Sequence, residues 1–256
     1  LIFTNNDSAY ETALEFKKNN VEPIILDTRE EHSSELIDEA KSKGIDIRFS
    51  HGVIVANGYK KVKSAKIGKL NKEKNSFEKI ETIDCDCICV SGFWTPSVHL
   101  ASQSGNKLKY EEKIDAFIPD KKKQHETSVG AANGSFTLEE SLKHGFENGS
   151  NLSAKITETK TEISIPNVNE KKYGAHDKFW CMPLPKNENP KRFVDFQNDV
   201  SVSDIEIALR EGYRSIEHVK RYTTLGMATD QGRTSNLNGL QLVSNIENKI
   251  VPEVGH

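Results

Sequence analysis

The first 50 residues of the chain alternate between two hydrophobic patterns. Short apolar runs typical of strands occupy residues 1–4, 21–27 and 45–49, and the segments 7–18 and 33–43 between them place apolar side chains near a 3.6-residue spacing. A serine opens the second of these helical segments, and Gly44 follows its end. The order strand–helix–strand–helix–strand predicts a parallel sheet with right-handed crossovers.

From residue 52 to residue 90 the pattern changes to short β runs. Residues 53–56 and 62–67 are joined by Asn57-Gly58-Tyr59, a hairpin signal. We expect a polar loop over 69–79 and an apolar strand over 83–90 that returns to the parallel sheet. This order resembles the NAD-binding half of glutathione-reductase-type flavoproteins. The predicted fold class is α/β, with a Rossmann-like dinucleotide-binding unit made of a parallel sheet plus a β-meander.

The second half of the chain contains a small-residue turn, a polar stretch and a group of helices. The turn at 128–134 precedes a predicted helix over 138–144, and the polar composition of 151–190 indicates a linker. Three helices are predicted over 202–210, 216–222 and 235–246. We therefore expect a Rossmann domain over 1–110, a segment returning to a first dinucleotide-binding domain over 111–150, a linker over 151–190, and a small helical domain over 191–256.

The turn after the first strand is where a dinucleotide-binding fold would hold pyrophosphate, using glycines that allow close backbone approach. Residues 4–9 contain no glycine, and Asp7 adds a negative charge there. Asp27 ends the second strand, as a ribose-binding acid would. Two interpretations stay open: nucleotide binding at this turn, or capping of the first helix by Asn5, Asn6 or Asp7.

Composition excludes several classes of function. The formal net charge of −3 comes from 35 basic and 38 acidic residues that are interleaved, so we expect neither a nucleic-acid nor a membrane partner. No run of about 18 apolar residues and no signal-peptide pattern is present, which favours a cytoplasmic location. The chain begins without methionine, inside an apolar run, and we expect it to be an internal fragment.

The cysteines offer no evident metal site or disulfide framework. Cys85, Cys87 and Cys89 alternate along a predicted strand, and Cys181 has no evident partner. Alternation in a strand gives a row on one face, unlike the tetrahedral pocket that zinc prefers. We expect a buried apolar row, because free cysteine behaves as a small hydrophobe.

Two stretches near the end of the chain have the frame of an iron–sulfur domain. In small helical 2Fe–2S domains of redox subunits, Cys-x-Cys precedes two short helices, and Gly-Met-x-x-Cys-Gln-Gly-Arg-x-Cys follows them. The four ligand positions are held here by Asp195, Gln197, Asp230 and Ser235. Cluster iron takes thiolate or imidazole ligands, which none of these side chains provides. We therefore expect the helical domain to resemble a 2Fe–2S domain without its cysteines and to hold no iron–sulfur cluster.

This kept frame with altered ligands resembles the alpha subunit of heterotetrameric sarcosine oxidase. Agreement covers residues 193–200 and 211–232, and also 4–10, 90–100 and 130–134. In that family the chain continues into a folate-binding domain similar to aminomethyltransferases. The resemblance implies an oxidoreductase that demethylates sarcosine with O2 and tetrahydrofolate. It further implies beta, gamma and delta subunit partners, FAD in the beta subunit, and NAD and FMN contacted by the alpha subunit.

The resemblance also implies which residues contact cofactors. No catalytic or metal-ligating residue is expected in this stretch, because sarcosine is oxidised in the beta subunit. The NAD contacts are expected at the small-residue turn, at Gly130, Ala131, Phe136 and Leu138. The FMN, shared with the beta subunit and attached covalently through it, is expected to contact Lys220, Arg221, Thr223, Thr224, Gln231, Thr234 and Ser235.

Other interpretations of these residues remain open. The turn at 130–134 is also typical of an ordinary tight turn before a packed helix, and Lys220 and Arg221 are equally typical of a solvated basic helix end. The chain could instead belong to the alpha subunit of a related proline dehydrogenase or opine oxidase, where intact cluster cysteines would be expected. A non-catalytic scaffold with decayed nucleotide sites is the third possibility, indicated by the glycine-free turn at 4–9.

Overall fold

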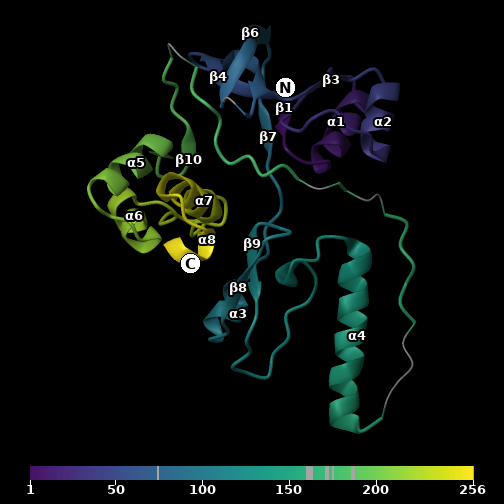
Figure 1. Cartoon of the computed structure of the whole chain (residues 1–256). Coiled ribbons are helices and arrows are strands. Elements are labelled where there is room, and N and C mark those ends of the chain that lie inside the picture. Colours follow the sequence, from purple (N-terminus) through teal and green to yellow (C-terminus); the bar gives the residue numbers. More distant parts are fainter. Residues whose placement is uncertain (74, 160–163, 171–172, 175, 186–187, 256) are drawn as a thin grey trace. The chain divides into compact units, whose positions relative to one another are not determined.

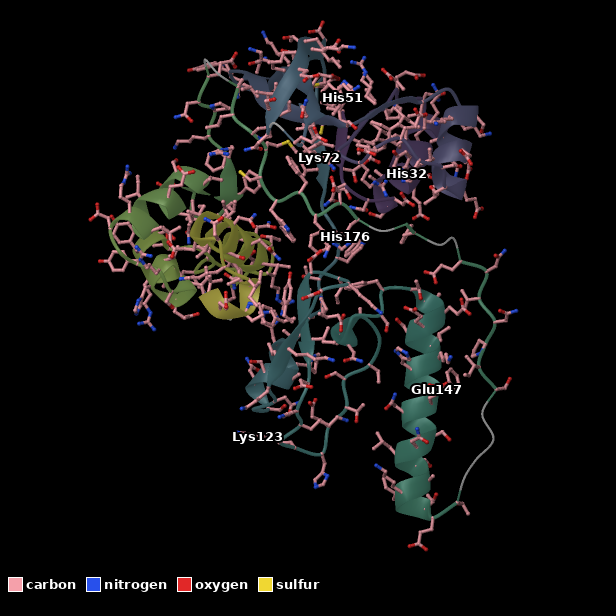
Figure 2. All side chains as sticks on the ribbon, in the orientation of Figure 1. His32, His51, Lys72, Lys123, Glu147 and His176 are labelled. Carbon is pink, nitrogen blue, oxygen red and sulfur yellow. The ribbon has the colours of Figure 1, made fainter. Side chains whose placement is uncertain are left out.

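The computed structural model describes the chain except residues 74, 160–163, 171–172, 175, 186–187 and 256 (Figure 1). It consists of two compact units. The first combines Leu1–Gly92 with Tyr173–His256, and the second is Phe93–Lys172. Figure 2 shows the side chains of the described residues.

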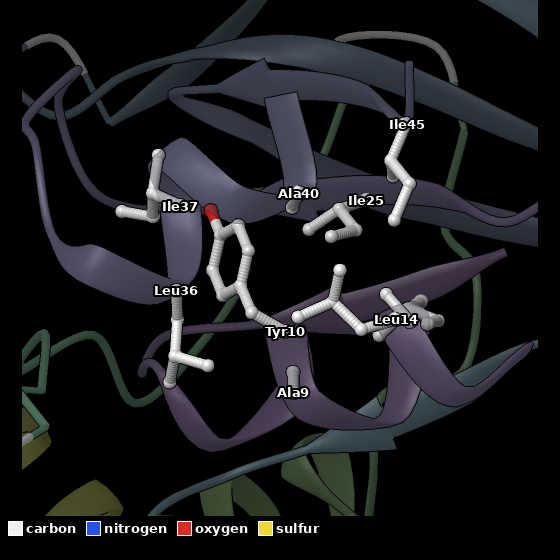
Figure 3. Packing of buried hydrophobic residues seen from close by; sticks show 10 residues of the cluster. Ala9, Tyr10, Leu14, Ile25, Leu36, Ile37, Ala40 and Ile45 are labelled. Atoms are coloured by element: carbon white, nitrogen blue, oxygen red, sulfur yellow. The ribbon is translucent and has the colours of Figure 1, made fainter. Parts of the chain in front are cut away.

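A four-stranded parallel sheet forms the centre of the first unit. Its order is β3-β2-β1-β7, made of β1 (Ile2–Thr4), β2 (Ile24–Asp27), β3 (Asp46–Phe49) and β7 (Cys89–Ser91). The helices α1 (Ser8–Lys18) and α2 (Glu35–Ser42) connect the first three strands. Figure 3 shows Tyr10, Leu14, Ile25 and Ile37 packed together between these helices and the sheet, and all four are buried. The predicted Rossmann-like order is therefore present.

An antiparallel meander covers the other face of the parallel sheet. It comprises β4 (His51–Gly58), β5 (Val62–Asn71) and β6 (Ser76–Asp84), paired in that order. Leu26 of the parallel sheet packs with Ala65 and Ile67 of β5 in a second buried cluster. Because successive side chains in a strand point to opposite faces, Ile25 faces the helices and Leu26 faces the meander.

The structure corrects three predictions in this region. The expected polar loop over 69–79 contains the end of β5 and the start of β6. The expected strand over 83–90 is divided, since residues 83–84 end β6 in the meander and residues 89–91 form β7 in the parallel sheet. The prediction of a buried cysteine row is wrong, because Cys87 is exposed and Cys85 and Cys89 are only half-buried. The chain crosses from one sheet to the other at these cysteines, so they line no common strand face.

The second unit contains a short hairpin and a long helix. Helix α3 (His99–Gln103) precedes the hairpin of β8 (Leu108–Glu111) and β9 (Ala116–Pro119), and the 3-10 turn η1 (Gly130–Asn133) precedes α4 (Leu138–Thr157). The helix predicted to end near residue 144 continues to Thr157, into the stretch expected to be a linker. The Thr137 side chain accepts a hydrogen bond from the Glu140 amide and caps its start. No residue of α4 is buried.

The C-terminal part of the first unit is a small group of helices. A short antiparallel pair, β10 (Phe193–Asp195) and β11 (Val200–Ser201), leads into α5 (Val202–Arg210), α6 (Ile216–Thr223), α7 (Asn236–Glu247) and α8 (Val251–Val254). Ser201 and Asp204 form a capping box at the start of α5. Among the helices in the described ranges, none combines the length and apolar character needed to cross a bilayer.

Candidate functional site

The buried carboxylate of Asp195 holds together the loops of the C-terminal helices, residues 193–254, which we call the helical segment. Asp195 lies at the end of β10 and is only 2% exposed. Its Oδ2 accepts hydrogen bonds from the Gly226 amide at 2.8 Å and from Ser235 Oγ at 3.4 Å, and its Oδ1 accepts one from the Gln197 amide at 2.9 Å. One donor lies two residues after Asp195, and the other two lie 31 and 40 residues after it, in the stretch between α6 and α7. The carboxylate therefore ties together the ends of the stretch that has the iron–sulfur frame.

The remaining two ligand positions also meet. Gln197 Oε1 accepts a hydrogen bond from the Asp230 amide at 3.4 Å. The Asp230 carboxylate accepts bonds from the Gly232 amide at 3.1 Å and from Thr234 Oγ1 at 2.7 Å. These hydrogen bonds hold the pKa of Asp230 below its ordinary value, with that from Thr234 contributing most. The four positions thus lie together in two hydrogen-bonded pairs, Asp195 with Ser235 and Gln197 with Asp230.

Two glycines let these loops close. Gly226 and Gly232 are buried with φ of +67° and +74°, and the side chain of Asn236 lies where a Cβ on either would stand. A larger residue at either position would be strained in its backbone and would displace Asn236.

In the described part of the chain, no group of three or more His, Cys, Asp or Glu side chains could hold a metal ion.

The structure gives different surroundings to the residues predicted to contact FMN. Lys220 and Arg221 lie in the last turn of α6, and in the part of the chain that the structure describes neither has a carboxylate within 4.0 Å. Three hydroxyls are already engaged: Thr223 Oγ1 donates to the Val219 carbonyl at 2.7 Å, Thr234 to Asp230, and Ser235 to Asp195. Thr224 ends α6 in the left-handed region, and Gln231 Nε2 donates to the Ala228 carbonyl at 2.8 Å. The two cations are the predicted contacts left open to an anion.

Exposed apolar side chains flank these loops. Phe196 is 78% exposed and Met227 is 54% exposed, although both are large and apolar. The rings of Phe193 and Phe196 pair with centroids 5.7 Å apart. Apolar side chains gathered on one surface are a common feature of interaction sites.

The small-residue turn lies in the second unit, beside a polar cavity of about 290 Å³. Gly130 is buried with φ of +61°, and a Cβ there would come within 3.2 Å of Ser141 Oγ at the start of α4. Ala131 is exposed, Phe136 is half-buried and Leu138 is 53% exposed. The positive φ of Gly130 and its close approach to Ser141 therefore favour glycine at that position. The cavity is lined by Asn106, Pro119, Asp120, Lys122, Glu126, Thr127, Ser128, Val129, Asn133, His144 and Asn148.

A buried ionic network occupies the carboxyl ends of β1 and β2. Arg29 Nη2 lies 2.7 Å from Asp7 Oδ1 and 2.7 Å from Asp27 Oδ2, and both carboxylates are completely buried. Tyr10 donates its hydroxyl to Asp27 Oδ2 at 2.8 Å. Burial alone would lower the pKa of Arg29, but the hydrogen bonds and charges of Asp27 and Asp7 outweigh it and raise that pKa. Asn6 rather than Asp7 accepts a bond from the Ser8 amide, at 3.0 Å, at the start of α1.

Sequence reasoning missed this network. It considered Asp27 as a ribose-binding acid and Asp7 as a cap, but not Arg29. The available signal was the spacing, since Arg29 follows Asp27 by two residues and both come directly after an apolar strand. A cation placed there can neutralise both acids at the same edge of the sheet.

The fold defines this chain as a Rossmann-like α/β protein. It superimposes on L-proline dehydrogenase from P. horikoshii with a TM-score of 0.60 and 18% sequence identity, over 96% of this chain and 50% of that chain. Residues 189–256 match the family model described as sarcosine oxidase A3 domain.

The relatives identify the family. The chain is 32% identical to sarcosine oxidase subunit alpha of Rhizobium meliloti (strain 1021) over 99% of its length, and 27% identical to that of Corynebacterium sp. (strain P-1) over 95% of its length. The chain belongs to the sarcosine oxidase alpha-subunit family. It spans 24% and 26% of these two relatives, respectively.

Proposed function

We propose that this chain supports the binding of FMN and NAD, and the assembly of subunits, in an enzyme that oxidatively demethylates sarcosine with O2 and tetrahydrofolate. The enzyme would carry FAD in a beta subunit and would include gamma and delta subunits. The proposal rests mainly on two features of the helical segment. Its sequence matches the sarcosine oxidase A3 domain. At the four ligand positions, none of which carries sulfur, the Ser235 hydroxyl bonds to the Asp195 carboxylate and the Asp230 amide bonds to the Gln197 side chain.

The side chains available at the helical segment favour a phosphate-bearing cofactor over a metal cluster. Carboxylate, amide and hydroxyl groups are poor ligands for cluster iron, and here they are used to hold loops together. Lys220 and Arg221 are positioned to attract an anion, because neither has a carboxylate partner among the described residues. Arginine can grip a phosphate with two parallel hydrogen bonds, and lysine adds a point charge. FMN, when bound, would supply electron transfer, and these residues would hold its phosphate.

The turn at 130–134 is the second part of the proposal. Gly130 allows the backbone to turn tightly just before α4. The first amides of that helix already face an anion, because those of Leu138 and Glu139 donate to the Glu170 carboxylate at 2.7 and 3.2 Å, and a bound phosphate would replace this side chain. We assign NAD to this turn, with Gly130, Ala131, Phe136 and Leu138 as contacts. The adjacent polar cavity leaves room for part of a ligand.

Subunit assembly is the third part. Phe196 and Met227 are exposed beside the loops that would face FMN. Burial of such side chains against a beta subunit would remove apolar surface from water and stabilise the complex. Such contacts would place the cofactor between this chain and the beta subunit.

Replacing both Lys220 and Arg221 with alanine is expected to lower FMN occupancy of the purified complex by at least about tenfold, since charge-assisted phosphate contacts contribute roughly 1.5–3 kcal/mol each. Occupancy is measured as the ratio of FMN to FAD, where the covalently attached FMN is the flavin that stays with the denatured protein and FAD is the flavin released from it. The matched control is Lys60→Ala with Lys61→Ala, which removes two neighbouring exposed cations from the tip of the β4–β5 hairpin.

The control variant should keep the wild-type ratio of FMN to FAD. Unchanged FMN occupancy in the Lys220/Arg221 variant, with the complex intact, would show that these cations are a solvated helix end. Loss of the complex itself would instead be visible as altered subunit stoichiometry, measured on the same samples.

A further inference from the structure

A segment from the second half of the chain crosses the edge of the parallel sheet where a dinucleotide-binding fold would hold its ligand. We call residues 173–177, of which Tyr173, Gly174, His176 and Asp177 are described, the strap. The Asp177 amide donates to the Asn5 carbonyl at 2.9 Å, and Asn5 Nδ2 donates to the Asp177 carbonyl at 3.0 Å. The strap therefore pairs with the glycine-free turn in both directions.

The strap also contacts the buried carboxylate at the start of α1. The Gly174 amide donates to Asp7 Oδ2 at 2.8 Å, while Asp7 Oδ1 faces Arg29 at 2.7 Å. A Cβ on Gly174 would come within 3.2 Å of Asp7 Oδ2, so the strap backbone approaches the carboxylate closely. Burial alone would raise the pKa of Asp7, but the Gly174 amide and Arg29 outweigh it and lower that pKa.

These contacts lie where a nucleotide-binding turn would hold a phosphate, but here the anion belongs to the protein. In a nucleotide-binding turn, amides at the helix start face a bound phosphate. Here the protein supplies the anion itself, as Asp7, and Arg29 neutralises it. A bound phosphate would stand against a completely buried carboxylate and would meet the strap backbone. Asp7 and the strap therefore occupy the position that a phosphate would take.

We propose that the strap is an internal ligand of this sheet edge, which uses the former nucleotide crevice to fix the path of the chain toward the helical segment. Further contacts continue along that path. Lys72, directly after β5, donates from Nζ to the Asp177 carboxylate at 2.5 Å. The Met182 sulfur lies over Gly52, where a Cβ would come within 2.8 Å of it. Lys66 pairs with Glu188, directly before the A3 domain match begins.

Hydrogen–deuterium exchange of the full-length protein in its complex tests this inference. Asp7→Asn removes the charge that accepts the Gly174 amide but keeps the size of the side chain. We expect the amides of Gly174 and Asp177 to exchange about tenfold faster or more in this variant, as the loss of a hydrogen bond to a charged group implies. Asn5→Ala, at a partly exposed position, should accelerate exchange of the strap to a smaller extent. Asp199→Asn, on an exposed turn with φ of +54°, is the matched control.

Two results would overturn the inference. One is unchanged strap exchange in both Asp7→Asn and Asn5→Ala, while the rest of the protein keeps wild-type exchange. The other is a response to NAD added back to a complex from which bound NAD has first been removed, in which residues 4–9 become protected or the strap is released. Protection by NAD at residues 130–138 alone agrees with the inference, and absence of any protection there counts against the proposed NAD site without affecting the strap.

Discussion

Replacing Arg29 with alanine is expected to lower the free energy of unfolding by about 3–5 kcal/mol, the usual cost of removing one partner of a buried ion pair. The guanidinium is the cation that faces both Asp7 and Asp27, and both carboxylates are completely buried. Without it, two like charges would remain out of water at one sheet edge. Burial raises the pKa of Asp7 and Arg29 helps to lower it, so without Arg29 the Asp7 carboxylate would take up a proton more readily, and the variant should be less destabilised at low pH than at neutral pH. Chemical denaturation at two pH values measures both effects.

Arg48→Ala is the matched control. Arg48 also pairs with two carboxylates, at 3.1 Å from Asp46 and 2.9 Å from Glu81, but those partners are about half exposed. Solvent screens such pairs, and their removal should cost no more than about 1 kcal/mol. Equal losses in the Arg29 and Arg48 variants would contradict the view that the network at the sheet edge is an essential substitute for a ligand.

Replacing Asp195 with alanine is expected to destabilise the helical segment by roughly 3 kcal/mol or more, because buried donors lose a charged acceptor. The Gly226 amide and the Ser235 hydroxyl both donate to this carboxylate, and Asp195 and Ser235 are buried. The loops that meet at the former ligand positions would separate. Thermal unfolding of the intact protein and amide exchange at residues 225–235 measure the effect.

Two comparisons sharpen this result. Asp195→Asn keeps an acceptor oxygen and should lose less stability than Asp195→Ala. Asp230→Ala removes a carboxylate that is partly exposed, and water can replace it for Thr234, so a smaller loss is expected than at Asp195. If Asp195→Ala left exchange at residues 225–235 unchanged, the carboxylate could not be the group that holds the frame together.

The parallel sheet was predictable because its strands and helices carry different hydrophobic periods. Strand β6 was missed for a physical reason. Most of its residues are exposed, since it lies at the edge of the meander, and its sequence therefore shows no buried face. The continuation of α4 beyond His144 was missed similarly, because none of its residues is buried. Elements without a buried face leave little hydrophobic pattern.

The site was predictable only where a motif kept its spacing. The frame around Asp195 and Ser235 could be located from sequence, and the structure brings those residues within hydrogen-bonding distance. The contact between Gly174 and Asp7 could not, because 167 residues separate them and neither carries a motif. The sequence predicts that Thr223 and Thr234 contact FMN, and in the structure their hydroxyls donate hydrogen bonds to Val219 and Asp230. Residue type alone did not reveal that these donors are already used.

We propose that the frame of a metal-cluster domain supports a flavin here, in an enzyme of sarcosine oxidase type. The most direct test is the content of iron, FMN and NAD in the purified full-length complex. On one sample, metal analysis gives the iron, the flavin that stays with the denatured protein gives the FMN, and the nucleotide released on denaturation gives the NAD. The account predicts FMN and NAD together, in amounts close to one per alpha subunit, and no iron. Stoichiometric iron bound to the alpha subunit would contradict it, and so would an intact complex that carries neither nucleotide.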